Sequence, residues 1–453
     1  MSREMIERAL QRATDTKACL IGDGALAQTA ALVKGLFDGA DRAIVVDDPR
    51  TRAVAGEKVA DMLRGAGIEV EEHVLEPGGK IFHGDYRYAE EVREAVKAAG
   101  VEKRGKRIVP VAVGSGVVND VTKRASGELG IPYVVVGTAA SVDGYSSFGA
   151  ALRSPEGAKQ TYPCPAPRAI VADLDVMRTA PSWMAASGFA DLMAKVPAGA
   201  DWILAAELGA AEWHDSAWHT VQDGLGEAIG DPEGVVAMQT GPLERFVEGL
   251  MLGGFAMQDM RSSRPASGAE HMFSHLLEMR DHTFRGEIVP HGIQVGVFTL
   301  FMCRVYEQIL AFDYSKLDVD ACLANWKPLE EQERIGAAMF AGTKFPDIGV
   351  KAARAKFVDR EAARARLEDL RARWPEVKAR LAGQLVPASE IERRLKVVGA
   401  PTTPEMIGSS VEASLADVRK TVYMRDRYMA LDFLDLTGQL DAFARRAFAC
   451  RSA

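Results

Sequence analysis

The chain has 453 residues, which is enough for two or three domains of ordinary size that each bury a core. Its hydrophobic content of 47% and charged content of 26% are typical of a soluble globular enzyme. Because the net charge is −8, a surface for nucleic acid or for an anionic membrane is not expected, and any phosphate site must be local.

The cysteines and the N-terminal residues indicate a cytoplasmic protein. The five cysteines are scattered and never form a C-x-x-C pair, so the sequence predicts neither a disulfide framework nor a zinc knuckle. Residues 1–17 are charged and amphipathic, and no run of about 18 apolar residues occurs later in the chain. We therefore expect neither export nor insertion into a membrane.

The first part of the chain, up to about residue 180, alternates short apolar runs with helical patterns. This alternation predicts a mostly parallel sheet covered by helices. Strands are expected at Ala18–Gly22, Ala43–Asp47, Glu69–Val74, Ile108–Val113, Tyr133–Gly137 and Ala169–Ala172. Helices are expected between the strands, for example at Thr51–Gly65 and Ala89–Ala98.

After about Asp175 the strand signals stop and the apolar residues follow a helical period. The helices expected there are Ser182–Gly209, Leu243–Met260, Ser267–Arg280, His291–Phe312, Leu329–Ala341 and Asp359–Gln384. Acidic residues are interspersed in the Ala- and Arg-rich segment Lys351–Leu381, which is therefore interpreted as a solvated helix or helical hairpin rather than a nucleic-acid arm. The change of period predicts an α/β domain over residues 1–178 and an all-α domain over residues 179–453.

Two glycine-rich turns each join a predicted strand to a helix. The first, IGDGALAQTA at Ile21–Ala30, lacks the third glycine of a Rossmann fingerprint. The second, VAVGSGVVNDVTK at Val111–Lys123, has small residues that would let backbone N–H groups approach a pyrophosphate closely. Both turns could equally be tight corners, and the pattern alone does not choose between them.

Acidic and hydroxyl side chains gather where two other predicted strands end. Asp47 and Asp48 close the second strand, where a carboxylate can accept both ribose hydroxyls of NAD and repel the 2′-phosphate of NADP. Alternatively, the Asp-Asp-Pro sequence simply turns the chain. The segment Val134–Pro167 places small polar side chains where α/β sheets bind ligands, namely Thr138, Ser141, Asp143, Ser146 and Ser147.

Four of the eight histidines fall within residues 262–292, which indicates a local need for imidazole. His271 and His275 are four residues apart, so a helix would place both rings on one face. His291 lies between a proline and a glycine, which can end one helix and start another. Two imidazoles and a carboxylate, for which Asp191 is a candidate, would form a metal site with one open position. A histidine pair at this spacing can also be an ordinary solvated or core pair.

These motifs resemble those of the sn-glycerol-1-phosphate dehydrogenases, a branch of the iron-containing alcohol dehydrogenase and dehydroquinate synthase superfamily. The matching stretches are GFADLMAK, SRPASGAEHMFSH followed by HG, KQTYPCPAPRAIVADLDV, VVGAPTTPEMIGSSVE and MRDRYMALDFL, so the resemblance spans nearly the whole chain. It implies a dehydroquinate synthase-like fold, with an α/β Rossmann-like nucleotide-binding domain followed by an all-α metal-binding domain. One departure is Ile293, where HGEKVGV-like sequences carry Glu; it puts in doubt a supporting contact rather than the metal itself.

The resemblance also implies residues for both sites. It places one divalent metal on Asp191, His271 and His291, and makes His275 a substrate-contacting or proton-relaying residue. The stretch GSGVVNDVTK matches the superfamily's GGGSxxDxxK loop for NAD(P), except that Ser115 and Val117 replace the commoner Gly and Ser.

The other cofactor residues follow from two shorter matches. The D-x-x-T spacing favours Asp48 over Asp47, and TAASVDGYSS resembles a PTAASxDGxxS stretch that lines the nicotinamide and touches the substrate. The implied cofactor-binding residues are Asp48, Gly114, Ser115, Gly116, Val117, Asn119, Asp120, Thr138, Ala139, Ser141 and Ser147. The implied catalytic residues are His275 and Asp143, and the implied substrate-binding residues are Asp143, Asp191, His275 and Arg264.

The activity that this resemblance implies is the NAD(P)-dependent, metal-assisted interconversion of dihydroxyacetone phosphate and sn-glycerol 1-phosphate. The alternatives are a glycerol dehydrogenase-like or dehydroquinate or cyclitol synthase-like enzyme of the same superfamily and, more remotely, a non-catalytic nucleotide-binding protein. NAD and NADP both stay open, as do Zn, Ni and Fe. For the substrate phosphate, Arg264 is preferred to Lys159 and Arg285, because dehydroquinate synthases hold an arginine at the same distance before the first metal histidine. The expected assembly is a homodimer or a larger homo-oligomer.

Overall fold

The structure is a computed structural model that describes residues 3–77, 82–101, 107–155, 157 and 159–450. The chain forms two compact units, each discontinuous in sequence. The first unit contains Met1–Leu192 and His219–Ser262, and the second contains Met193–Trp218 and Ser263–Ala453. The first unit therefore includes helices on both sides of residue 178, and a functional division at that residue stays a prediction.

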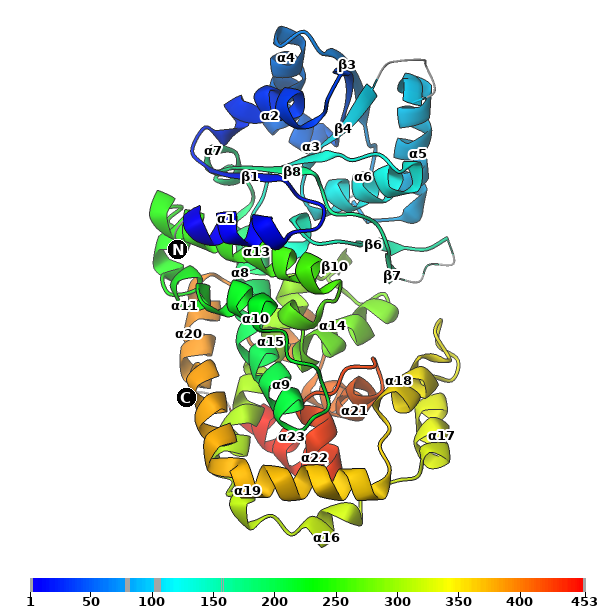
Figure 1. Ribbon diagram of the computed structural model, residues 1–453, viewed down its shortest axis with the longest axis vertical. Helices are drawn as coiled ribbons and strands as arrows, with labels where there is room; N and C mark the ends of the chain where they lie inside the picture. Colours follow the sequence, from blue (N-terminus) through cyan, green and yellow to red (C-terminus); the bar gives the residue numbers. More distant parts are fainter. Residues whose placement is uncertain (1–2, 78–81, 102–106, 156, 158, 451–453) are drawn as a thin grey trace. The chain divides into compact units, whose positions relative to one another are not determined.

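Six strands of the first unit form one parallel sheet with the order β1-β8-β5-β4-β2-β3 (Figure 1). They are β1 (Ala18–Gly22), β2 (Ala40–Asp47), β3 (Glu69–Val74), β4 (Arg107–Gly114), β5 (Val134–Gly137) and β8 (Ala169–Asp173). Each lies where the sequence predicts a strand, and the predicted fold class is confirmed. Because the strands are parallel, Asp47, Gly114, Gly137 and Asp173 all lie at the carboxyl edge of the sheet, where such sheets bind ligands.

Helices cover both faces of this sheet (Figure 1). The helices α2 (Thr29–Leu36) and α4 (Glu57–Gly65) bury Val33, Val59 and Leu63 in a core shared with alternate strand residues. The chain reverses its direction across the sheet after β3, and right-handed crossovers then require α5 (Tyr86–Val96) and α6 (Gly116–Leu129) to lie on the opposite face.

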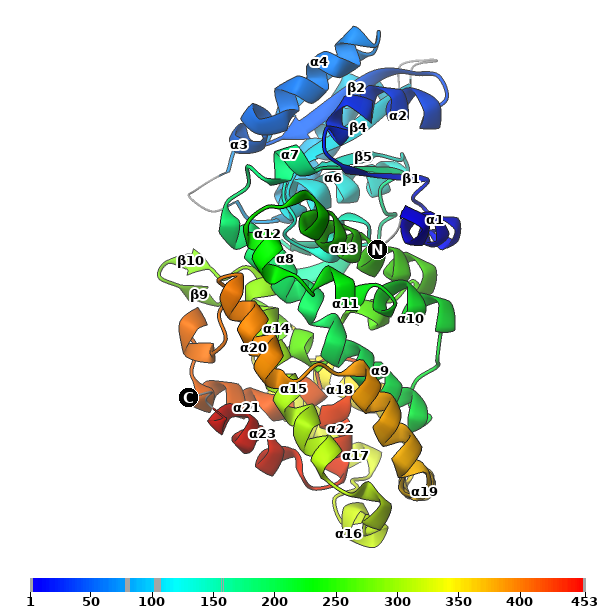
Figure 2. The same ribbon diagram turned by 90° about the vertical axis from the view of Figure 1, so that its left-hand side faces the viewer.

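In the first unit, segments that are far apart in the sequence pack against each other. The helix α1 (Arg3–Arg12) lies along α13 (Thr240–Met260), as both views show (Figures 1 and 2). Gln258 of α13 donates to the hydroxyl of Thr16 at 2.8 Å. The remaining elements are η1 (Ala25–Gln28), α3 (Pro49–Thr51), η2 (Arg52–Gly56), η3 (Lys97–Val101), η4 (Asp143–Tyr145), α7 (Leu174–Met177), α8 (Ser182–Met193), α10 (Asp215–Gln222), α11 (Leu225–Ala228) and α12 (Pro232–Val236), of which α8 and α10 extend into the second unit.

Two short hairpins were not predicted. The strands β6 (Ala150–Arg153) and β7 (Lys159–Tyr162) pair antiparallel, and so do β9 (Thr283–Phe284) and β10 (Glu287–Ile288). These strands have four and two residues, too few for alternation of polarity to stand out in the sequence. The β9–β10 turn uses left-handed conformations at two consecutive residues, with φ of 55° at Arg285 and 80° at Gly286, as tight hairpins favour.

The second unit is helical apart from the β9–β10 hairpin. Its central helix, α15 (His291–Ala311), packs against α9 (Lys195–Glu207), α14 (Ala269–Met279) and α20 (Ala388–Val397) (Figure 2). The remaining elements are η5 (Arg264–Ala266), η6 (Tyr314–Lys316), α16 (Val319–Leu323), α17 (Leu329–Phe340), α18 (Ile348–Lys356), α19 (Arg360–Gln384), η7 (Pro404–Ile407), α21 (Val411–Val422), α22 (Ala430–Leu436) and α23 (Leu440–Ala449). Within the described residues, α15 alone is long and apolar enough to cross a membrane, but 78% of its apolar stretch is buried, as in a core helix.

The helical half departs from one predicted boundary and agrees with the helical interpretation of Lys351–Leu381. The pattern from Ser182 to Gly209 is divided into α8 and α9 at Ala194. Pro197 lies in the first turn of α9, where a missing N–H is tolerated, whereas it would remove a hydrogen bond from one continuous helix. The segment Lys351–Leu381 forms α18 and α19, with Asp359 capping α19 by accepting from the Ala362 N–H at 2.7 Å.

The close approach of α8 to the loop after β5 gives a testable constraint. A Cβ atom at Gly188 would lie 2.1 Å from the carbonyl oxygen of Ala140. We expect Gly188→Ala to lower the free energy of unfolding by about 1–3 kcal/mol, because the helix or the loop must shift. Gly35→Ala in α2 is the control, since no atom lies within 4 Å of its added Cβ. Equal destabilisation of the two variants in denaturant unfolding would contradict this packing.

Candidate functional site

The helix that carries His271 and His275 begins at two buried carboxylates. Asp201 accepts a hydrogen bond from the Ala269 N–H at 2.8 Å, and Glu270 accepts one from the Gly268 N–H at 2.6 Å. Both bonds satisfy amides at the N-terminus of α14 that have no partner within the helix. His271 therefore lies in the first turn of a helix whose start is fixed.

Three histidine rings converge in the second unit. The ring centroid of His291, at the start of α15, lies 5.4 Å from that of His271 and 5.9 Å from that of His275. The rings of His271 and His275 are 6.4 Å apart on one face of α14, as the four-residue spacing predicts. The fourth histidine of the sequence window, His282, instead bonds the carbonyl of Ile407 at 2.7 Å through Nε2.

Each ring is oriented through its Nδ1 atom. His271 Nδ1 bonds Glu270 at 2.7 Å, and Glu278 bonds His291 Nδ1 at 2.9 Å and His275 Nδ1 at 3.3 Å with its two oxygens. A carboxylate oxygen accepts hydrogen bonds, so the Nδ1 side of each ring faces its carboxylate and Nε2 is directed away from it. Histidine ligands of protein-bound metals are commonly held in this way.

Asp191 provides the carboxylate that the sequence prediction required. It lies in the last turn of α8, whose final residue, Met193, belongs to the second unit. Asp191, His271 and His291 each offer one ligand atom, and these atoms lie within 4.8 Å of one another. Two neutral imidazoles and a carboxylate are a donor set that a divalent transition metal accepts, and three ligands leave a position open. The residues present therefore fit the expected metal.

His275 differs from the two candidate ligands beside it. It lies outside the group of converging ligand atoms, and 25% of its side chain is exposed, compared with 7% for His271. Burial lowers the pKa of His275 to about 3, an effect that the hydrogen bond to Glu278 opposes and the charge of Arg425 reinforces. The ring is therefore neutral at physiological pH.

The carboxylates that hold these rings were not singled out from the sequence. Glu278 is three residues after His275 and seven after His271, so helical spacing alone places it on the histidine face. The Ser274 hydroxyl oxygen also lies 3.1 Å from His291 Nδ1, and its proton is donated to Gln294 Oε1 at 3.2 Å. The supporting contact put in doubt by Ile293 is thus supplied for His291 by Glu278 and Ser274.

The two glycine-rich turns differ in what their amides bind. In the first turn, the Gly24 N–H donates to Asp175 at 3.2 Å and the Leu26 N–H donates to Asp173 at 2.7 Å. Two carboxylates already occupy this turn and would repel a phosphate. The structure therefore favours the second turn as the anion-binding one.

The second turn has the geometry of a phosphate cradle. A Cβ at Gly114 would lie 2.5 Å from the Val118 side chain, so only glycine fits at the end of β4. Ser115 precedes α6 without capping it through its side chain, and Gly116 and Val117 are the first residues of that helix. Backbone amides at this helix N-terminus are therefore available to an anion such as the pyrophosphate of a dinucleotide.

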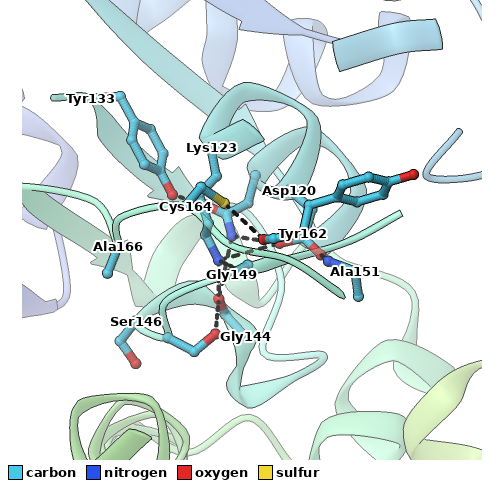
Figure 3. A network of polar contacts seen from close by, with 12 residues as sticks. Asp120, Lys123, Tyr133, Gly144, Ser146, Gly149, Ala151, Tyr162, Cys164 and Ala166 are labelled. Carbon is cyan, nitrogen blue, oxygen red and sulfur yellow. Dashed lines mark hydrogen bonds and ion pairs between the residues drawn. The ribbon is translucent and has the colours of Figure 1, made fainter. Parts of the chain in front are cut away.

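Asn119 and Asp120 stabilise the neighbouring loop together with a buried lysine that was not assigned a role from the sequence (Figure 3). Lys123 donates to the carbonyls of Gly144 and Gly149 at 2.9 and 3.1 Å and lies 3.3 Å from Asp120 Oδ1. Asp120 Oδ2 accepts from the Ala151 N–H at 3.2 Å, and Asn119 Oδ1 accepts from the Tyr133 hydroxyl at 2.8 Å. Their contribution to cofactor binding stays a prediction.

The loop that Asp120 and Lys123 support contains most of the remaining candidates for cofactor and substrate binding. The Thr138 N–H donates to the Gly114 carbonyl at 3.1 Å, and the Tyr145 hydroxyl donates to the Ala139 carbonyl at 2.8 Å. Ser147 donates to the Gly144 carbonyl at 3.2 Å, and Ser141 is buried. The Asp143 N–H donates to Asp191 Oδ2 at 3.2 Å. The direct contacts of these residues with cofactor or substrate stay predictions.

The two aspartates at the end of β2 have different environments. Asp48 caps α3 by accepting from the N–H groups of Arg50 and Thr51 at 2.8 and 3.1 Å. Asp47 is fully buried, neither of its carboxylate oxygens has a hydrogen-bond partner within the described residues, and burial raises its pKa to about 7. Asp48 therefore turns the chain at the start of α3, Asp47 lacks a partner within the described residues, and the ribose contact implied for Asp48 stays a prediction.

The three basic residues considered for binding the substrate phosphate differ in their environments. Arg264 is buried and donates to the Tyr428 carbonyl at 2.9 Å. Arg285 is exposed at the hairpin turn, with its guanidinium 4.9 Å from the Phe284 ring centroid. The side chain of Lys159 lies outside the described residues.

Comparison with known proteins identifies the family. Residues 20–181 match the family model for iron-containing alcohol dehydrogenases. A glycerol-1-phosphate dehydrogenase [NAD(P)+] from Halalkalibacterium halodurans is 33% identical, covering 58% of this chain and 64% of the relative. Those from Bacillus licheniformis and Pyrococcus furiosus are 32% and 31% identical, covering 68% and 63% of this chain and 77% and 78% of the relatives. The chain belongs to the glycerol-1-phosphate dehydrogenase family.

Solved structures confirm the fold of this family member. A glycerol dehydrogenase from Schizosaccharomyces pombe superposes with a TM-score of 0.58 at 17% identity, over 96% of this chain and 91% of the other. An iron-containing alcohol dehydrogenase from Thermococcus thioreducens gives 0.59 at 17% identity, over 96% and 99%. The chain therefore has the fold that the sequence resemblance implies.

The metal assignment can be tested directly. We expect His271→Ala and His291→Ala to lose bound metal and activity while unfolding cooperatively, because each removes one of three ligands. Metal content would be measured by mass spectrometry and cooperativity by thermal unfolding. His219→Ala is the control, because His219 pairs with Asp223 at 2.7 Å on the surface. Stoichiometric metal in purified His271→Ala would disprove the assignment.

The nucleotide turn can be tested in the same way. We expect Gly116→Val to weaken NAD(P) binding, since a branched side chain would block approach to the first amides of α6. The same change at Gly24, where φ is 68°, should act mainly by lowering stability. Calorimetry that showed affinity lost at Gly24 and unchanged at Gly116 would identify the other turn as the cofactor site.

Proposed function

We propose that this chain interconverts dihydroxyacetone phosphate and sn-glycerol 1-phosphate, using NAD or NADP and one divalent metal. The observation that carries this proposal is the convergence of one ligand atom each from Asp191, His271 and His291, with Nδ1 of both rings bound to a carboxylate. The family supports it further, because the relatives from three genera are named glycerol-1-phosphate dehydrogenases that use NAD(P)+.

In this proposal Asp191, His271 and His291 hold the metal. A divalent metal would polarise the C2 carbonyl as a Lewis acid, and the nicotinamide would carry the hydride. Glu270 and Glu278 fix the planes of the two imidazoles through the Nδ1 bonds and so direct their Nε2 atoms away from the carboxylates. The protein's contribution is thus to hold three donors in place before the substrate arrives.

His275 is proposed as the proton-transfer group. Its Nδ1–H is held by Glu278, so its Nε2 can accept a proton from the substrate hydroxyl in the oxidative direction. Asp143 is proposed to contact the substrate. Its backbone N–H already bonds Asp191, which places it next to a proposed metal ligand.

The cofactor is proposed to bind the α/β part of the chain, residues 1–178, with its pyrophosphate on the turn Gly114–Val117. Asp48, at the end of β2, is proposed to accept the ribose hydroxyls of NAD, and its carboxylate would repel the 2′-phosphate of NADP. We also propose that the enzyme acts in the cytoplasm as a homodimer or larger homo-oligomer.

The proposed function can be tested by a substrate screen. Both glycerol phosphate enantiomers and dihydroxyacetone phosphate would be assayed with both nicotinamide cofactors and with Zn, Ni or Fe, following the absorbance of the reduced nicotinamide. We expect sustained turnover with sn-glycerol 1-phosphate and little with the 3-phosphate. Turnover of unphosphorylated glycerol alone, or none with any metal, would refute the proposal.

The His275→Ala variant distinguishes a proton-transfer role of His275 from a role as a metal ligand. We expect His275→Ala to retain stoichiometric metal but lose rate by about 10²–10⁴-fold, as for other positioned proton-transfer groups. The loss should fall on kcat at least as much as on KM, because the ring acts in the transition state. Metal loss as complete as that of His271→Ala would make His275 a ligand, and unchanged kinetics would make it a bystander.

A further inference from the structure

Three arginines gather beside the segment that leads into the histidine helix. Arg425 Nη1 and Arg427 Nη2 both donate to one oxygen atom, the hydroxyl of Ser263, at 3.3 and 2.8 Å. Arg427 Nη1 also donates to the carbonyl of Ser267, and Arg264 donates to the carbonyl of Tyr428 at 2.9 Å. The segments 263–267 and 425–428 are therefore bound to each other by reciprocal arginine hydrogen bonds.

Within this arginine cluster (Arg264, Arg425 and Arg427), the charges of Arg425 and Arg427 are not balanced by direct contacts with carboxylates in the described residues. Neither Arg425 nor Arg427 forms an ion pair with a carboxylate in the described part of the chain. By contrast, Arg280 in the same unit binds Asp417 through two nitrogens at 2.7 and 2.5 Å. Placing guanidinium groups together away from water without carboxylate partners costs free energy that a bound anion would recover.

The pKa directions agree with this geometry. Loss of water, reinforced by the neighbouring charges of Arg264 and Arg425, lowers the pKa of Arg427 to about 9. Loss of water also lowers the pKa of Arg425, while Asp426 and Glu278 partly oppose this. The arginines therefore repel one another in the absence of an anion.

The cluster also lies next to the proposed proton-transfer residue. The charge of Arg425 acts on His275, and the charge of Glu278, which bonds His275, acts on Arg425. An anion bound to Arg425 would therefore be close to the ring that is expected to face the reacting carbons. A three-carbon substrate has its phosphate at one end, so the two groups would have to be recognised within a few bond lengths of each other.

We propose that Arg425 and Arg427, together with Arg264, bind the phosphate group of the substrate, and that Ser263 positions the first two guanidinium groups for it. This inference rests on the proposed function and names residues that bind the phosphate. Arg427 is tied to Ser263 and Ser267 and acts as a fixed donor. Arg425 is partly exposed and makes one hydrogen bond of 3.3 Å, so most of its five N–H donors remain for phosphate oxygens.

Arg425→Gln is the principal test, and Arg280→Gln is its matched control. Arg280 lies in the same unit, but its guanidinium already has a carboxylate partner. Inorganic phosphate would be titrated by calorimetry into the metal-loaded and the metal-free protein, because only the metal-free titration excludes binding of phosphate to the metal. We expect Arg425→Gln to weaken phosphate binding in both forms by about 10- to 100-fold, as for loss of hydrogen bonds to a charged group, and Arg280→Gln to leave it unchanged.

Kinetics provide a second readout. Arg425→Gln should raise KM for dihydroxyacetone phosphate by a similar factor and lower kcat/KM for dihydroxyacetone, which has no phosphate, by much less. Arg425→Lys keeps the charge but loses the planar fork, so it should fall between the wild type and Arg425→Gln. Ser263→Ala, which removes the shared acceptor, should weaken phosphate binding by less than Arg425→Gln.

The outcomes distinguish this inference from the proposed function. Phosphate affinity that is unchanged in Arg425→Gln, or equally reduced in Arg280→Gln, overturns the phosphate site. An equal loss of activity on dihydroxyacetone and its phosphate also overturns it, because Arg425 would then serve the structure rather than the phosphate. If the wild type acts on neither glycerol phosphate but its phosphate binding still depends on Arg425, the proposed function fails and the phosphate site stands.

Discussion

The second unit depends on one buried carboxylate. Asp201, on α9, accepts the N–H of Ala269 at 2.8 Å, the N–H of Ala430 at 2.9 Å and the hydroxyl of Tyr306 at 2.6 Å. These bonds fix the N-termini of α14 and α22 relative to each other and connect both to α15. Burial, reinforced by Glu270, raises the pKa of Asp201 to about 6, so the interaction is formed at an electrostatic cost. That cost is consistent with a residue that serves positioning, because α14 carries His271 and α22 directly follows the arginine segment.

A buried lysine has the corresponding role in the first unit. Lys123 is 1% exposed and satisfies the carbonyls of Gly144 and Gly149, which lie on a loop without regular structure beyond one short helical turn. A loop of this kind cannot satisfy its own backbone, so a side chain from the neighbouring helix has to do so. Since α6 also begins with the turn Gly114–Gly116, one helix determines the position of both the glycine turn and the loop that holds Asp143.

The periodicity of the sequence predicted the strands and the helix faces. It could not predict contacts between residues that are distant in the sequence. All six strands of the parallel sheet follow from apolar runs, and the shared face of His271 and His275 follows from their spacing. Helical spacing would also have placed Glu278 on the histidine face. By contrast, no pattern in the sequence links Arg425 and Arg427 to Ser263, because 160 or more residues separate them. The sequence also did not predict the hydrogen bonds of the Gly24 and Leu26 amides, since their partners, Asp175 in α7 and Asp173 at the end of β8, lie about 150 residues further along the chain.

The use of arginines for the phosphate and of histidines for the metal has a chemical reason. A phosphate dianion is itself a good ligand for a divalent metal, and a substrate that bound through its phosphate would occupy the open position that the carbonyl oxygen needs. Guanidinium groups compete for phosphate oxygens by paired hydrogen bonds and do not bind metals. Carboxylates held next to the histidines have the complementary effect, because Glu270 and Glu278 raise the negative charge around the metal ligands and disfavour a second anion there. Guanidinium groups for the phosphate and a metal for the carbonyl oxygen would thus orient a substrate that carries a phosphate at one end and a carbonyl at its centre.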